Sequence, residues 1–190
     1  YGDHRDLHKE YRRQRQMCIR DRVEEGVRFV NVTWDAFWTR PAKLDGTIWD
    51  THQRNFGICR ETLLPQYDLT FSGLMEDLEN RGTLDETLVV WCGEFGRLPV
   101  AQTGKKPGRD HNPHCLTAWL AGGGIRGGTT YGASDDVGFR AAENRVHIND
   151  LHATILHLLG LDHELLTYSY NGRDFRLTDV AGRVIRDVIA

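Results

Sequence analysis

A continuous apolar run at residues 87–92, Thr-Leu-Val-Val-Trp-Cys, most constrains how this 190-residue chain can fold. A strand with apolar side chains at successive positions is typical of a sheet that is covered on both faces. Two more segments resemble strands: residues 27–33 alternate apolar and polar side chains, and residues 115–121 form another apolar run. Together they predict a sheet with at least three strands.

Helical patterns separate and follow these strands. Residues 59–81 carry apolar side chains at steps of three and four, and Gly82 follows as a helix stop. A second helix is expected over residues 151–159, with Asn149 or Asp150 as its N-cap, and a short last helix in the tail. This order predicts the α/β class, with a mostly parallel sheet flanked by helices.

The composition excludes several classes of protein. Hydrophobic residues make up 39% and charged residues 27%, a soluble globular balance, and no apolar run approaches the roughly 20 residues of a membrane-spanning helix. The net charge of -3 leaves no basic surface for nucleic acid. Four separated cysteines without C-x-x-C spacing argue against a disulfide framework or a zinc knuckle.

Residues 1–22 do not fit the pattern of the rest. Residues 11–22 form a basic run, which has the composition of a nucleic-acid-binding arm or of a solvated helix face. A third interpretation fits better: Met-Cys-Ile-Arg-Asp-Arg at 17–22 is the translation of ATG TGT ATA AGA GAC AGN, which resembles a transposon-based sequencing adapter. We therefore expect residues 17–22, with several residues before them, to be translated adapter; residues 1–22 are set aside as unreliable, and residues 23–190 are the expected domain.

Three polar clusters follow the predicted strands. They are Asp50 with His52, Glu94 with Arg97, and the group Arg109, Asp110, His111 and His114. Carboxylates and imidazoles without thiolates suit zinc, manganese and similar divalent ions. Because ligands bind beyond the carboxyl ends of parallel strands, the clusters are expected to converge there. One or two metals with a nearby arginine would suit displacement at phosphorus or sulfur.

Each cluster also has a plainer interpretation. An isolated Asp-x-His is more often a turn with a capping Asp, and Glu94 is as well placed to cap the turn after its strand. Arg109–His114 packs more ionisable chemistry into six residues than an ordinary loop requires. The glycine-rich residues 122–128 are best interpreted as a tight turn, and no G-x-S-x-G nucleophile elbow occurs.

At these motifs the chain resembles a known family. The motifs are, in order, GVRFV at 26–30, WDTH at 49–52, DETLVVWCGEFGR at 85–97, GRDHNP at 108–113 and LAGGGIRGG at 120–128. This set resembles the sulfatase-like domain-of-unknown-function family numbered 1501, of the alkaline phosphatase superfamily. Residues 150–161 are similar to the late helix of sulfatases. The resemblance implies an alkaline-phosphatase-like fold that is incomplete here, residues 23–190 being its carboxy-terminal part.

The resemblance also implies roles for individual residues. Its implied metal ligands are Asp50, His52, Glu94 and His111, with Asp110 as a further ligand, because Phe95 stands where members carry a ligand histidine. Zinc is the expected ion, with manganese, magnesium and calcium as alternatives. Arg97 or Arg109 would steady the oxyanion, and His114 would act on the leaving group. The first metal-binding Asp and the nucleophile would belong to an amino-terminal half outside this chain.

The expected function is metal-dependent hydrolysis of sulfate or phosphate esters, on a small molecule or a polysaccharide, by an exported bacterial protein, periplasmic or extracellular. The fragment itself is expected to be inactive, and no nucleic-acid partner or membrane span is expected. An alternative is a catalytically silent, secreted metal-binding or scaffold protein of the same fold. A third hypothesis, a phosphomutase or nucleotide pyrophosphatase, shares the site and differs only in substrate.

Overall fold

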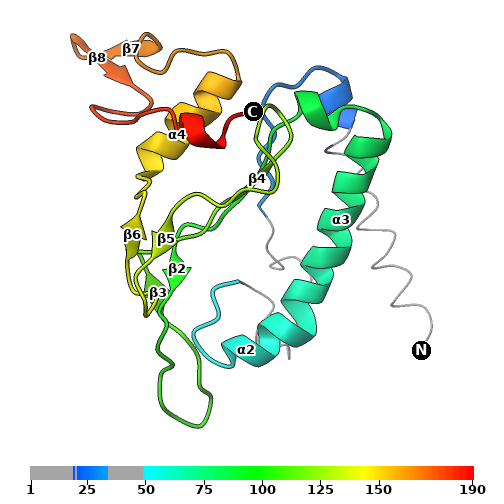
Figure 1. The fold of residues 1–190 in the computed structure, drawn as a ribbon, viewed down its shortest axis with the longest axis vertical. Coiled ribbons are helices and arrows are strands. Elements are labelled where there is room, and N and C mark those ends of the chain that lie inside the picture. The colour runs from blue at the N-terminus through cyan, green and yellow to red at the C-terminus, as the bar shows by residue number, and fades with distance from the viewer. Residues whose placement is uncertain (1–18, 20, 34–48) are drawn as a thin grey trace. The chain divides into compact units, whose positions relative to one another are not determined.

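A computed structural model describes residue 19 and residues 21–33 and 49–190 of the chain (Figure 1). The chain divides into two compact units. The first comprises residues 1–77 together with 102–108, and the second comprises residues 78–101 and 109–190. Most of the segment assigned to an adapter, residues 1–22, lies outside the described residues, as do residues 34–48.

Helices dominate the described part of the first unit. The helix α2 (Asn55–Ile58) continues into a π-helical turn, η2 (Cys59–Leu63), and then into α3 (Leu64–Asn80), whose last residues belong to the second unit. Pro65 explains the π-turn: it has no N–H for the carbonyl of Glu61, and its ring would clash with that carbonyl in a regular α-turn. The predicted helix over 59–81 is confirmed, and Gly82 follows it with φ +67°.

The second unit contains four separate two-stranded sheets, all antiparallel. The pairs are β1 (Val89–Trp91) with β4 (Trp119–Ala121), β2 (Gly96–Arg97) with β3 (His111–Asn112), β5 (Ala133–Ser134) with β6 (Ala141–Glu143), and β7 (Thr167–Tyr170) with β8 (Arg173–Arg176). Two short 3₁₀ turns, η3 (Leu84–Glu86) and η4 (Arg186–Val188), and the helix α4 (Ile148–Leu158) complete the unit.

The prediction of a mostly parallel sheet flanked by helices is therefore wrong. β1 and β4 are joined by residues 92–118, which contain the β2–β3 pair and no helix, whereas parallel neighbours need a crossover that is usually helical. β1 is not covered on both faces either, because Trp91 and its cross-strand partner Trp119 are each 39% exposed. Residues 27–33, predicted as a strand, form no ladder with the described residues.

The helix α4 (Ile148–Leu158) begins three residues before the predicted start. The predicted N-cap, Asn149 or Asp150, is wrong, because His147 is the N-cap and both predicted residues lie inside the helix. Asp150, at the third helical position, completes a capping box by accepting a hydrogen bond from the His147 N–H. At the other end, Gly160 has φ +78°, and the N–H groups of Gly160 and Leu161 bond back to His157 and Leu156. This Schellman motif confirms Gly160 as the stop.

The buried centre around α4 joins the helix to the carboxy-terminal tail. Ala153 and Thr154 are fully buried, and Ile185 from the tail is 8% exposed. The Thr154 hydroxyl donates to the Asp150 carbonyl oxygen (2.7 Å) and accepts from the Ile185 N–H (3.0 Å). Because the buried hydroxyl both donates and accepts a hydrogen bond, Thr154 holds the tail and leaves no unpaired polar group of its own. The predicted last helix is present here only as the single turn η4.

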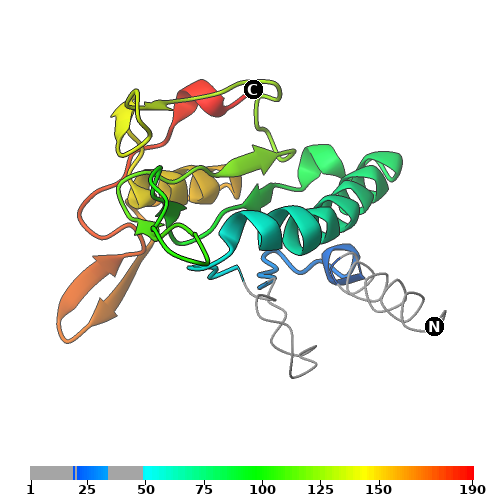
Figure 2. The same ribbon diagram turned by 90° about the horizontal axis from the view of Figure 1, so that it is seen from below.

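The β7–β8 hairpin is an element that the sequence analysis did not predict. It projects at one extremity of its unit (Figure 2), and its turn residues Asn171 and Gly172 have φ +51° and +74°. Asn-Gly with both residues at positive φ is the signature of a type I′ hairpin turn, and it is present in the sequence. One face of the hairpin carries the stacked ring pair of Tyr168 and Phe175.

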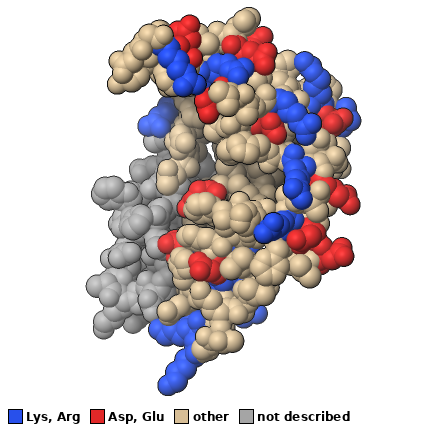
Figure 3. All heavy atoms as spheres, turned by 90° about the vertical axis from the view of Figure 1, so that its left-hand side faces the viewer, with Lys and Arg blue, Asp and Glu red and all other residues tan. Residues whose placement is uncertain are grey.

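The described helices agree with one expectation about partners, the absence of a membrane span. Across residues 21–33 and 49–190, no helix is both long enough and apolar enough to cross a membrane. On the face drawn in Figure 3, acidic and basic side chains are interspersed.

Candidate functional site

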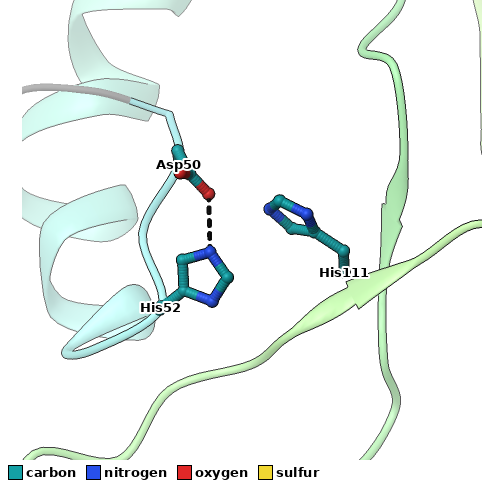
Figure 4. A group of neighbouring side chains, drawn as sticks. All are labelled: Asp50, His52 and His111. Atoms are coloured by element: carbon teal, nitrogen blue, oxygen red, sulfur yellow. Dashed lines mark ion pairs between the residues drawn. The ribbon is translucent and has the colours of Figure 1, made fainter.

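Asp50 and His52 are the two predicted metal ligands that lie in the first unit, and their side chains contact each other. The His52 Nε2 lies 2.9 Å from the Asp50 Oδ1, and Figure 4 marks this contact. The two side chains are 42% and 55% exposed for His52 and Asp50 respectively, so water and ions reach both. A carboxylate and an imidazole at this distance can share a proton or a divalent cation.

The segment that carries this pair is anchored by the residue between its two members. Thr51 is 4% exposed, and its hydroxyl accepts a hydrogen bond of 2.6 Å from the side-chain amide of Asn55. The same amide lies 3.6 Å from the Cys59 sulfur. Because Thr51 points inward, its neighbours on either side are turned toward solvent, and Asn55 ties them to the start of the helical segment.

A loop of the same unit packs against the backbone of His52. The Arg54 N–H donates to the Pro107 carbonyl oxygen (2.9 Å), and the Gln102 N–H donates to Gly108 (2.8 Å), which closes the loop. A side-chain carbon at Gly108 would overlap the carbonyl group of His52. The glycine of the GRDHNP motif is therefore required for a close approach of two backbone segments.

In the second unit, β2 and β3 bring His111 opposite Arg97 in register. The ring of Phe95 stacks on the His111 imidazole, with centroids 5.3 Å apart and planes at 24°. Figure 4 also draws His111, which stands on β3. The Asp110 Oδ1 accepts a hydrogen bond of 2.8 Å from the His111 N–H. Phe95, which the sequence marks as a departure from the family pattern, is thus the residue that packs against His111.

The two predicted oxyanion-binding arginines each donate to a backbone carbonyl of the opposite segment, just outside the β2–β3 ladder. Arg97 donates from Nη1 to the Arg109 carbonyl oxygen (3.1 Å), and Arg109 donates from Nη1 to the Leu98 carbonyl oxygen (3.2 Å). The Leu98 N–H in turn donates to Asp110 (2.9 Å). Each guanidinium has five N–H donors, so these bonds fix its position and use one donor each.

The two remaining predicted residues flank this sheet in the chain. Glu94 is exposed in the turn before β2. His114 is exposed two residues after β3, where its N–H donates to the Asn112 Oδ1 (3.1 Å). Asn112 itself is 1% exposed and donates from its amide to the Phe139 carbonyl oxygen (3.0 Å). Sequence analysis did not single out Asn112, although a buried amide with partners on two segments organises this part of the unit.

The structure corrects how the clusters were expected to meet. The expectation was a common edge at the carboxyl ends of parallel strands, and this edge does not exist among the described residues, because β2 and β3 are antiparallel. Asp50 and His52 form one local group, in the first unit. Arg97, Arg109, Asp110 and His111 form another around β2–β3, in the second. The functional roles assigned to these residues stay predictions.

The donor chemistry of the first group fits a divalent cation. It offers carboxylate oxygen and imidazole nitrogen, which are ligands of zinc and manganese, and both side chains are accessible. Asp110 and His111 offer the same two donor types in the second unit. An ion bound by such side chains would take neutral imidazole and ionised carboxylate, so binding would be weakened by acid.

Comparison with known proteins gives one match. A family model described as "Protein of unknown function (DUF1501)" matches residues 1–189, almost the whole chain. No curated protein and no solved structure matches the chain.

Proposed function

The chain belongs to the DUF1501 family, and from this premise we propose that it acts in the metal-dependent hydrolysis of sulfate or phosphate esters, as a sulfatase-like relative of the alkaline phosphatases. The observation that carries the proposal is the Asp50–His52 pair, an oxygen and a nitrogen ligand 2.9 Å apart on side chains that are open to solvent. Esters of small molecules or of polysaccharides are the proposed substrates.

Each predicted residue has a part in this proposal. Asp50 and His52 bind a cation, zinc by preference, in the first unit, and Glu94, Asp110 and His111 are proposed as metal ligands in the second. When bound, the ion supplies Lewis-acid polarisation of the ester oxygen. Arg97 and Arg109, whose side chains are held by hydrogen bonds to backbone carbonyls, would donate to the oxyanion. His114 would give a proton to the leaving oxygen, which its accessibility permits.

Metal content tests the proposal directly. The wild-type chain, purified without chelator and dialysed against zinc, is expected to retain the metal in elemental analysis, and Asp50→Asn and His52→Gln are each expected to lower its stoichiometry. His157→Gln is the matched control, because His157 is an exposed histidine on α4. Unchanged metal content in both variants would refute the assignment.

Activity separates the enzyme from its alternative. The specific observation that favours a catalytically silent metal-binding protein is Phe95, an aromatic ring against His111 where the family carries a ligand histidine. Zinc-loaded full-length protein, including the amino-terminal half that is expected to supply the nucleophile, is therefore assayed on p-nitrophenyl sulfate and p-nitrophenyl phosphate. Metal binding with turnover that His52→Gln abolishes supports the hydrolase, and metal binding with no turnover favours the silent protein.

A further inference from the structure

We propose that a cavity in the second unit binds a tetrahedral oxyanion, sulfate or phosphate, through His114, Arg140, Arg145 and His147. The cavity measures about 360 Å³. Ala141, Val146 and Asp150 complete its lining. The volume lies at the low end of the roughly 300–1,000 Å³ typical of small-molecule sites, which suits a single charged group with a small organic substituent.

The segments that form the cavity are tied together by hydrogen bonds. The Ala141 N–H donates to the His114 carbonyl oxygen (2.9 Å), which joins β6 to the segment after β3. At the base of Arg140, the Asp135 carboxylate accepts from the N–H groups of Phe139 (2.8 Å) and Arg140 (3.1 Å). These bonds fix the backbone at Arg140 and His114. Ligand binding therefore costs conformational entropy of the arginine side chain but little of the backbone.

His147 is held at the start of α4 with a defined arrangement of its ring protons. Its N–H donates to the Asp150 Oδ2 (2.9 Å), and its ring Nδ1 accepts from the Asn149 N–H (3.2 Å). In the neutral ring, an accepting Nδ1 leaves the proton on Nε2. His147 is thus a hydrogen-bond donor at Nε2 even without protonation, which is what an oxyanion requires.

The single acidic residue of the lining does not cancel the arginines. Asp150 is 9% exposed, and its two oxygens are occupied by the N–H groups of His147 (Oδ2) and Arg183 (Oδ1, 2.9 Å). Its charge is also close to the Arg183 guanidinium, 4.0 Å away. Arg140 and Arg145 therefore give the lining an excess of positive charge, which attracts anions.

Two arginines and two histidines that line one cavity of about 360 Å³ favour a compact oxyanion over an extended polymer, because arginine N–H groups pair with sulfate and phosphate oxygens and the volume admits only a small ligand. The inference does not depend on the proposed metal site. His114 is the residue that the two proposals share, and the other cavity residues have no role in the proposed hydrolysis.

Calorimetric titration tests the inference. Sodium sulfate and sodium phosphate are titrated separately into the full chain, with sodium chloride of equal ionic strength as the reference. Each is compared between wild type and the double variant Arg140→Gln/Arg145→Gln. The matched control is Arg60→Gln/Arg186→Gln, which removes the same charge from two exposed arginines outside the cavity. We expect at least about tenfold weaker oxyanion binding in the double variant and less than about twofold change in the control.

The outcomes distinguish the two proposals. Weaker binding in the cavity variant, with unchanged metal content, supports the inference whether or not the protein hydrolyses esters. No oxyanion binding by wild type beyond chloride, or equal losses in the cavity variant and the control, overturns it. Loss in Asp50→Asn but not in the cavity variant also overturns it, because the oxyanion would then lie at the proposed metal site. The single variants repeat the test if the double variant does not fold by circular dichroism.

Discussion

Replacing Asp150 with alanine should destabilise the second unit far more than the loss of an exposed carboxylate does. One carboxylate caps α4 through the His147 N–H and holds the tail through the Arg183 N–H, each at 2.9 Å. Loss of a helix cap costs about 0.5–2 kcal/mol, and a hydrogen bond to a charged group contributes about 1.5–3 kcal/mol. Because Asp150 is 9% exposed, water cannot fully replace these bonds. The expected loss is about 2–4 kcal/mol of unfolding free energy.

Urea unfolding followed by circular dichroism at 222 nm measures this loss. Asp150→Ala should lower the midpoint with little change in slope, and hydrogen exchange of the Arg183 amide should accelerate. Asp136→Ala is the control, because Asp136 is exposed in the loop between β5 and β6. A loss below about 1 kcal/mol, or one equal to that of the control, would show that the carboxylate does not hold the tail to the helix.

Three further changes test other contacts. Gly108→Ala should lower the free energy of unfolding by about 1–3 kcal/mol and lower metal retention, because the added carbon overlaps the His52 carbonyl group. The control Gly57→Ala meets only the Glu61 carboxylate at 4.0 Å and should be neutral or stabilising. Thermal melting and elemental analysis compare the two variants. Phe95→Ala removes a ring from His111 and should cost about 0.5–1.5 kcal/mol, with a shifted His111 ring resonance in NMR; an unshifted resonance would contradict the stacking. Burial, and secondarily the charge of Asp68, raises the pKa of Tyr67 in the folded protein above its ordinary value of 10.0. The stability that the protonated phenol contributes is therefore complete below pH 10 and is lost as the pH rises through the raised pKa of the folded state. Absorbance at 295 nm should show one tyrosine titrating late, and Tyr67→Phe should remove it.

The helices could be predicted because their determinants are local. Apolar side chains at helical steps over residues 59–81, and glycines at positions 82 and 160, contain the information that ends and orients each helix. The π-turn before Pro65 is also a local effect, since the proline removes one donor from the helix. The sequence pattern places the start of α4 too late, because an aspartate that caps from within the first turn resembles one that stands in front of the helix.

The sheets could not be predicted in the same way, because a strand's partner and direction depend on residues far along the chain. The apolar run at 87–92 fits a parallel central strand and an antiparallel pair equally well, and the absence of a crossover helix in residues 92–118 favours the second. The β7–β8 hairpin is different, since Asn171-Gly172 is a sufficient local signal and is present in the sequence.

The two Gly-Arg dipeptides show why a dense cluster of ionisable residues overstates the chemistry of a site. Gly96 and Gly108 each allow a backbone approach that a side chain would block, at Cys115 and His52 respectively. The arginine after each glycine donates to a backbone carbonyl of the opposite segment, so these four positions close the β2–β3 pair and its loop. Part of the polar character of both motifs is therefore structural. The residues of these motifs that remain candidates for function lie in the short segment from Asp110 to His114. Its carboxylate and imidazoles are held at fixed backbone positions, and a binding or catalytic site needs such rigid positioning from its scaffold.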